Sequence, residues 1–112
     1  MKNKKEINKS LKLAQKGDVQ AQYDLGRHYK DLASKEKYKD NKEKINLSFV
    51  EKNNNESANW FLMAAEQGFP DAQAEIALDY LARGNNRLAK KWSKKAFKQG
   101  SKLGQAVLGI LV

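Results

Sequence analysis

The fold is decided by the stretch Trp60-Phe-Leu-Met-Ala-Ala-Glu-Gln-Gly-Phe-Pro-Asp-Ala-Gln73. It has the pattern of one helix that ends at Gly68 and a second helix that begins at Pro70. Glycine adopts the left-handed conformation that ends many helices, and proline has its φ preset for a first helical position. Asp71 then stands where the helix dipole favours an anion. The stretch therefore predicts two helices joined by a tight turn.

Two degenerate copies of this pattern flank the stretch. The copy from Gly17 to Gln22 lies 51 residues before the segment from Gly68 to Gln73, and the copy from Gly100 to Gln105 lies 32 residues after it. Small and apolar residues correspond at matching positions around each copy, as close helix packing requires. A repeated helical hairpin cannot bury its apolar face alone, so the copies are expected to stack around a continuous core.

Residues 56–83 resemble the Sel-one-like repeats, which are relatives of the tetratricopeptide repeats. The resemblance is carried by Trp60-x3-Ala64-Ala65-Glu66-Gln67-Gly68-x-Pro70-Asp71-Ala72-Gln73-x2-Ile76-Ala77-x2-Tyr80. The copy at 8–29 has Lys9 in place of the tryptophan, and the copy at 88–112 keeps Trp92. The resemblance implies an all-α fold, a short right-handed α/α solenoid of two to three degenerate helical hairpins with about six helices, whose relatives mostly bind other proteins.

Local signals divide the chain into helices. Apolar spacing, glycines and capping residues predict helices over 3–16, 19–32 (continuing to about 44), 56–67, 70–83, 86–99 and 102–111. The predicted caps are Asp18, Asn55 and Ser101. We expect a single domain over 1–112, with an insertion or mobile loop at about 33–55 in which Phe49 and Val50 form an apolar patch. Trp60, Phe61, Trp92 and Phe97 are expected in the core, and Gln22, Gln73 and Gln105 are expected to make structural hydrogen bonds at the joints.

Charge is uneven along the 112 residues. The net charge is +9, with basic segments at 1–16 and 86–112 on either side of an acidic segment at 53–85. Cysteine is absent, which excludes a disulfide framework and a thiolate metal site. The basic N-terminus is not followed by an apolar signal region, and no apolar run approaches a membrane span. We therefore expect a cytoplasmic protein without a membrane partner.

Candidate catalytic groups are few. His28 is the one histidine, and it would need an orienting carboxylate and a nucleophile or metal to catalyse a reaction; Asp24, four positions earlier, can lie on the same helical face. Glu75 and Asp79 place two carboxylates on one helix face, which favours a solvated or binding strip more than an active site. No phosphate-binding glycine loop is present. The sequence favours a protein that is not an enzyme and that has no cofactor or metal site.

The sequence predicts a non-enzymatic protein–protein interaction module. The predicted partner-binding residues are Asp24, Arg27, His28, Phe49, Glu75, Asp79 and Arg83. Very small proteins of the Sel-one-like family resemble immunity proteins, so the resemblance also suggests a bacterial inhibitor that neutralises a cognate toxin. The alternatives are a generic adaptor or scaffold, and a basic binder of nucleic acid or acidic surfaces through Lys90, Lys94 and Lys98.

The chain is expected to be a monomer or a weak homodimer, and its apolar C-terminal helix bears on this. The helix either packs on one side and caps the stack, or forms a dimer or partner surface. The candidate residues for that surface are Leu108, Ile110, Leu111 and Val112.

Overall fold

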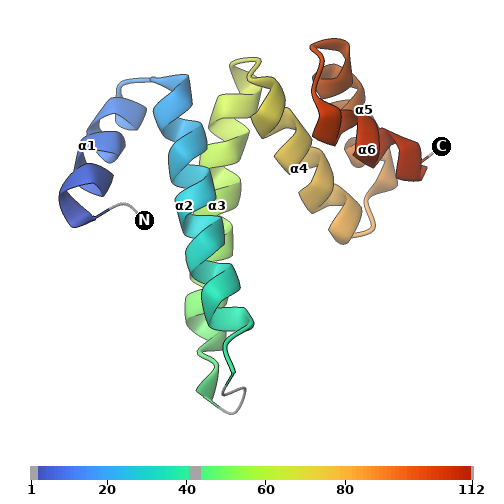
Figure 1. Cartoon of the computed structure of the whole chain (residues 1–112). Helices are drawn as coiled ribbons and strands as arrows, with labels where there is room; N and C mark the ends of the chain where they lie inside the picture. Colours follow the sequence, from blue (N-terminus) through green and yellow to red (C-terminus); the bar gives the residue numbers. More distant parts are fainter. Residues whose placement is uncertain (1–2, 41–43, 112) are drawn as a thin grey trace. The chain divides into compact units, whose positions relative to one another are not determined.

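The computed structural model describes residues 3–40 and 44–111 of the chain. In these residues the backbone forms six helices and no strand. They are α1 (Lys4–Gln15), α2 (Val19–Lys37), α3 (Leu47–Glu66), α4 (Pro70–Ala82), α5 (Asn86–Lys98) and α6 (Lys102–Leu111) (Figure 1). The predicted all-α class and the predicted six helices are confirmed.

The chain divides into two compact units, Met1–Trp60 and Phe61–Val112. In the first unit, α1 packs on α2 around the buried residues Ala14, Ala21 and Leu25. Partly buried side chains of Ile7, Leu11, Tyr29 and Trp60 pack against this cluster. The predicted core position of Trp60 is therefore confirmed. Asp18 caps α2 as predicted, because its Oδ1 accepts a hydrogen bond of 2.8 Å from the amide of Ala21.

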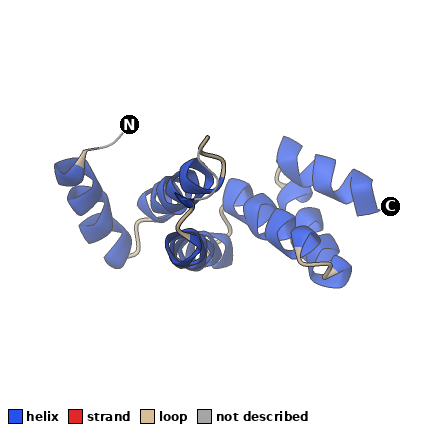
Figure 2. Ribbon diagram, turned by 90° about the horizontal axis from the view of Figure 1, so that it is seen from below, coloured by secondary structure: helices blue, strands red, loops and turns tan. Residues whose placement is uncertain are grey.

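Most of the predicted insertion at 33–55 is helical. Residues 33–37 belong to α2 and residues 47–55 belong to α3, so the connection is confined to residues 38–46. Figures 1 and 2 both show α2 and α3 side by side, as a long helical hairpin. Either helix alone would leave its few apolar side chains exposed in this segment. The hairpin buries them, since Ala33 of α2 and Val50 of α3 are both buried.

The asparagine run at 53–55 lies in the predicted insertion, before a helix predicted over 56–67 with Asn55 as its cap, and this prediction is wrong because α3 begins at Leu47. Asn53 is only 6% exposed, and its Nδ2 donates a hydrogen bond of 2.8 Å to the carbonyl of Phe49 one turn earlier. A satisfied, buried asparagine tolerates a helix interior. The cap is Asn46, whose Oδ1 accepts from the amide of Phe49 at 3.0 Å.

Near the turn between α2 and α3, Glu36 organises the chain. Its Oε1 accepts from Lys39 Nζ at 2.7 Å and from the amide of Asn46 at 2.8 Å. These two hydrogen bonds lower the pKa of the Glu36 carboxyl. Further along the pair, Ser57 Oγ donates to the carbonyl of Gly26 at 2.7 Å and joins α3 to α2.

The second unit contains α4, α5 and α6, each packed on the other two. Small side chains fill its interior. The buried apolar residues of these helices are Ala72, Ala74, Ile76, Ala77, Ala89, Ala96 and Val107. A close approach occurs at Gly104, where a Cβ atom would lie 2.7 Å from Cβ of Ala96 and 3.0 Å from the backbone nitrogen of Phe97. Ser101 caps α6 as predicted, accepting at Oγ from the amide of Gly104 at 3.0 Å.

The short joints at which a glycine ends the helix share one backbone geometry. At the joint between α3 and α4, the Gly68 amide donates to the Ala65 carbonyl at 2.9 Å and the Phe69 amide donates to the Ala64 carbonyl at 3.2 Å. This pair of bonds is the Schellman motif, and Gly68 has the positive φ of 93° that it requires. The predicted helix end at Gly68 is confirmed. The same bond pair recurs at Gly17 and Gly100.

Two of the three repeated glutamines have the predicted structural role. Gln22 Nε2 donates to the carbonyl of Ala14 at 3.1 Å, and Gln73 Nε2 donates to the carbonyl of Ala65 at 3.2 Å. Both side chains are buried and span the same interval of eight residues. Gln73 Oε1 also accepts from Gln99 Nε2 at 2.8 Å.

The third copy departs from this pattern. Phe97 stands where the other copies have the buried Ala14 and Ala65, and its side chain is 45% exposed although the core was predicted for it. A phenyl ring is too large for a position that elsewhere holds a methyl group. Gln105 is exposed, so the structural hydrogen bond predicted for it at the joint does not follow the buried bonds of Gln22 and Gln73. Trp92 is half-buried, with Lys95 Nζ 4.8 Å from its ring centroid.

The Gln73→Ala variant is expected to have a free energy of unfolding about 2 kcal/mol lower than that of the wild type, because it removes two hydrogen bonds from a buried position. Gln105→Ala is the matched control: it changes the corresponding exposed residue and should shift the free energy of unfolding by less than about 0.5 kcal/mol. Urea denaturation followed by circular dichroism measures both. Equal losses in the two variants would show that Gln73 has no special role at its joint.

Candidate functional site

A charged row runs along α4. Asp71, Glu75, Asp79 and Arg83 follow one another at intervals of four residues, which places them on one side of a helix. Asp71 is exposed, and Glu75 and Asp79 are half-buried. Arg83 Nε lies 3.2 Å from Asp79 Oδ2, an ion pair whose side chains are 61% and 41% exposed. The pairing of Arg83 with Asp79 agrees with the spacing in the sequence.

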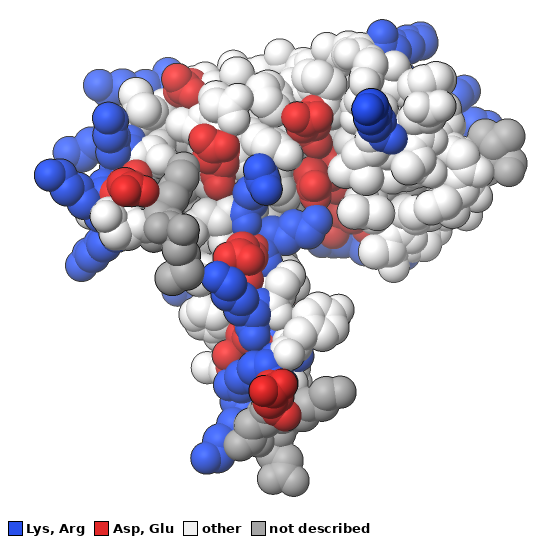
Figure 3. Space-filling view, viewed as in Figure 1, with Lys and Arg blue, Asp and Glu red and all other residues white. Residues whose placement is uncertain are grey.

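The opposite side of α4 is buried through Ala72, Gln73, Ala74, Ile76 and Ala77. Because these residues fix the helix in the unit, the charged row is held on a rigid support. Figure 3 shows acidic side chains gathered over α4. The row can contribute directed hydrogen bonds and a negative field, which are the properties of a polar binding surface.

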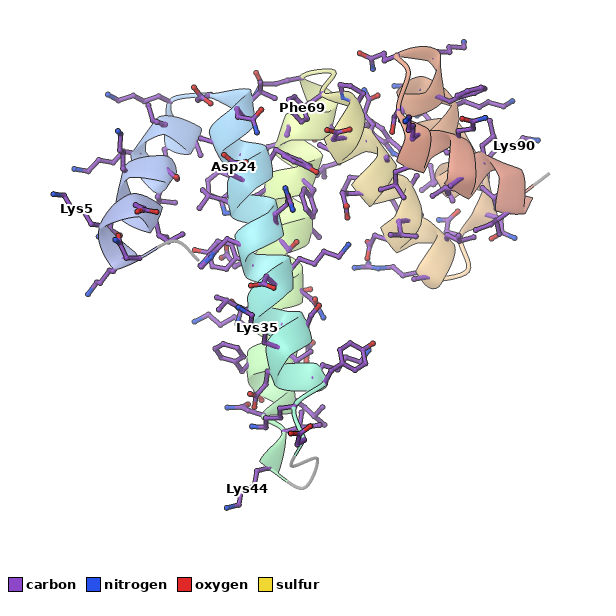
Figure 4. The ribbon with its side chains drawn as sticks, viewed as in Figure 1. Lys5, Asp24, Lys35, Lys44, Phe69 and Lys90 are labelled. Carbon is purple, nitrogen blue, oxygen red and sulfur yellow. The ribbon has the colours of Figure 1, made fainter. Side chains whose placement is uncertain are left out.

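The remaining predicted partner-binding residues lie in the first unit. Asp24, which Figure 4 labels on α2, accepts a hydrogen bond of 3.0 Å from Gln20 Nε2 one turn earlier. Arg27 is exposed, with its guanidinium carbon 5.9 Å from the ring centroid of Tyr23. In the repeat alignment, Gln20 and Asp24 correspond to the α4 residues Asp71 and Glu75. The predicted partner-binding residues thus fall into two groups, one on α2 and α3 and the other on α4 and directly after it.

His28 packs against an aromatic neighbour. Its ring meets Tyr29 edge to face, with centroids 5.2 Å apart and an interplanar angle of 68°. Burial, and secondarily the negative charge of Glu56 on α3, raise the pKa of the Tyr29 phenol, because both disfavour its ionised form. The phenol therefore stays protonated through neutral pH and up to its ordinary range. The geometry around His28 is that of aromatic packing between neighbours on α2.

The apolar pair predicted to form a patch is divided by the hairpin. Val50 is 9% exposed and belongs to the interior, whereas Phe49 is 39% exposed. Tyr38 and Leu47, near the turn, are each 73% exposed. Lys44 lies at this end of the hairpin (Figure 4). Phe49 therefore remains accessible as predicted, and the predicted role of Val50 in a docking patch is wrong because α2 and α3 bury it.

Lysines dominate the outer side of α5. Lys90, Lys94 and Lys98 are all exposed and follow one another at intervals of four residues, on the side away from the buried Ala89 and Ala96. Figure 4 labels Lys90 on the surface of this helix. Trp92 on this helix is half-buried, with Lys95 over its ring, which makes it a poor platform for stacking on a base. The lysine row can attract acidic surfaces through its charge.

The apolar helix α6 is partly buried. Val107 is 1% exposed, Leu108 and Leu111 are half-buried, and Ile110 is 69% exposed. The helix therefore packs on one side, as a cap on the stack would. It also presents Ile110 to solvent, as a dimer or partner surface would. Val112 lies outside the described residues. Leu103, 38% exposed, is an accessible residue that sequence reasoning missed. Its correspondence to the exposed Asp71 is the signal that would have found it.

Within the described ranges 3–40 and 44–111, no cluster of three or more His, Cys, Asp or Glu side chains has a geometry that could hold a metal ion. None of the helices in these ranges combines the length and the apolar character needed to cross a membrane.

Comparison with protein-family models, with curated proteins and with solved structures finds no match to this chain. The inference of function therefore rests on the residues and their geometry.

Proposed function

We propose that this chain is a non-enzymatic protein-binding module. The observation that carries the proposal is the charged row of α4, in which Asp71, Glu75 and Asp79 stand on a helix whose opposite side is buried. A helix held by its packing presents these groups with little loss of backbone freedom on binding. Pre-organisation of this kind favours affinity, and the charge pattern favours specificity and rapid association.

The corresponding positions of α2 support the same role. Gln20 and Asp24 there form a hydrogen-bonded polar pair, with Arg27 exposed beyond them. Similar backbone joints with different exposed residues are typical of repeat proteins, in which the joints maintain the scaffold and the variable positions select the partner. The partner of the α4 row is a protein surface rich in lysine or arginine.

The double variant Glu75→Lys, Asp79→Lys tests this proposal. It should keep the fold, because the Arg83–Asp79 ion pair that it removes is a surface pair worth at most about 1 kcal/mol. It should weaken binding of the natural partner at least about tenfold, because like charges would face each other across the interface. The control Glu51→Lys, Glu66→Lys makes the same change in net charge at exposed positions of α3 outside the row.

Partner capture from the native cells by each tagged variant, followed by calorimetry with the purified partner, gives the comparison. The product of a neighbouring gene is the first candidate to test, and a toxin domain there would define the module as an immunity protein. A partner that binds the Glu75→Lys, Asp79→Lys variant as tightly as the wild type would exclude the α4 row as the binding surface.

A further inference from the structure

Apolar side chains on α6 form a stripe that the neighbouring helices leave exposed. Ile110 is 69% exposed and Leu103 is 38% exposed, and Ala106 between them is also exposed. Their spacing of three and four residues places them along one side of the helix. The packing side of α6 is made by Gly104 and Val107, which are buried. The stripe thus lies beside the packing side and is open to a ligand.

This stripe lies on the same face of the unit as the acidic row of α4. The two helices pack on each other, and the repeat alignment gives Leu103 the position of Asp71 and Ile110 the position of Leu78. Asp71 and Leu103 are both exposed, as corresponding positions on one surface of neighbouring repeats can be. In Figure 3 the acidic side chains over α4 adjoin an uncharged surface over α6. We call Asp71, Glu75, Asp79, Leu103 and Ile110 the α4–α6 face.

We propose that the α4–α6 face binds a basic amphipathic helix of a partner protein. The apolar side of that helix covers Leu103 and Ile110, and lysine or arginine side chains at its edge reach the carboxylates of α4. Packed helices lie about 8–10 Å apart, a distance that a long basic side chain spans while its stem stays on apolar surface. This inference rests on the proposed function, because it names the partner segment for the same α4 row.

Charge disfavours two other classes of ligand at this face. The carboxylates of Asp71, Glu75 and Asp79 outnumber the one base in the row, Arg83, so the border of the stripe repels nucleic acid and anionic membranes. A second copy of the chain offers the basic row of α5, but there Phe97 is the one large apolar side chain exposed. A single ring does not match a stripe that extends over two turns of α6. A short apolar stripe beside an acidic row is the surface that one basic amphipathic helix covers.

The test uses the whole chain and three fluorescein-labelled peptides of equal length. The first has leucines at helical spacing with lysines beside them, the second has glutamates in place of the lysines, and the third is a scrambled form of the first. Fluorescence anisotropy at fixed ionic strength should show the first peptide binding at least about tenfold more tightly than the other two. Ile110→Ser should remove at least about tenfold of that affinity. The control Phe97→Ser changes an exposed apolar residue outside the face and should leave the affinity unchanged.

Binding that is insensitive to Ile110→Ser, or equal for the basic and acidic peptides, would overturn the inference. So would preferential binding of phosphatidylglycerol vesicles or a DNA duplex, or a dimer that Ile110→Ser dissociates while the peptide fails to bind. The result is separable from the proposed function. If partner capture is lost in the Glu75→Lys, Asp79→Lys variant but unchanged in Ile110→Ser, the proposed protein-binding function stands. The basic amphipathic helix is then excluded as the bound segment.

Discussion

Replacing Gly104 with alanine is expected to destabilise the protein by about 1–3 kcal/mol, although alanine is the better helix former. The added Cβ would lie 2.7 Å from Cβ of Ala96 and 3.0 Å from the backbone nitrogen of Phe97. Neither atom is the end of a flexible side chain, so α5 and α6 must move apart to admit the methyl group. Their separation would also loosen the contact of α6 with α4. Denaturant unfolding followed by circular dichroism measures the loss.

Gly109 provides the matched control on the same helix. A Cβ atom at Gly109 would meet no heavy atom within 4 Å. Gly109→Ala should therefore gain up to about 1 kcal/mol from helix propensity. The two alanine variants are expected to move the unfolding midpoint in opposite directions. A stabilised Gly104→Ala variant would contradict the close approach of α5 and α6.

The Gly68→Val variant is expected to lose about 2–3 kcal/mol of stability, because a β-branched residue is strained at positive φ. Gly68 has φ of 93°, and a Cβ atom there would meet no heavy atom within 4 Å. The loss would therefore come from the backbone and not from a clash. Thermal and urea unfolding of the purified variant would both report it.

Gly68→Asn separates backbone strain from other effects of the side chain. Asparagine tolerates left-handed conformations better than other non-glycine residues do, so this variant should retain about 1 kcal/mol more stability than Gly68→Val. Stability of Gly68→Val at the wild-type level would mean that the joint does not need the Schellman geometry.

The sequence predicts the helices wherever local chemistry decides their ends. Gly68 and Pro70 bracket the joint between α3 and α4, and Asp18 caps α2 with its own side chain. Such signals act within one turn of the chain, so they can be read from neighbouring residues. Repetition then adds longer-range information, since Gln22 and Gln73 make equivalent bonds at equivalent joints.

Prediction fails where a distant segment changes the local preference. Asn53 belongs to a run that favours a turn, yet it lies in α3 because the α2–α3 hairpin buries it and its amide bonds to Phe49. Phe97 fails in the opposite direction: its apolar character indicates the core, but its side chain is 45% exposed at a position where the other copies have the buried Ala14 and Ala65. Both outcomes depend on packing between helices, which apolar spacing alone does not specify.

In the candidate site, too, features set by local spacing were predicted and features set by helix packing were missed. The row from Asp71 to Arg83 follows from helical spacing and is found on one side of α4, as predicted. Leu103 was missed because an apolar residue on an amphipathic helix ordinarily belongs to the core. Its exposure depends on how α6 is rotated against α4 and α5. That rotation is fixed by the small residues Gly104 and Ala96 at the crossing.

The joints also bear on how quickly the chain finds its structure. The glutamine bonds that close two of them link residues only eight positions apart, and the turn bonds between backbone groups are shorter still. Closing such short loops costs little chain entropy, so neighbouring helices can meet before distant segments are in place. Helical proteins dominated by contacts of this kind fold within microseconds to milliseconds. The repeated joint therefore gives a nascent chain local order as each hairpin is completed, ahead of the rest of the sequence.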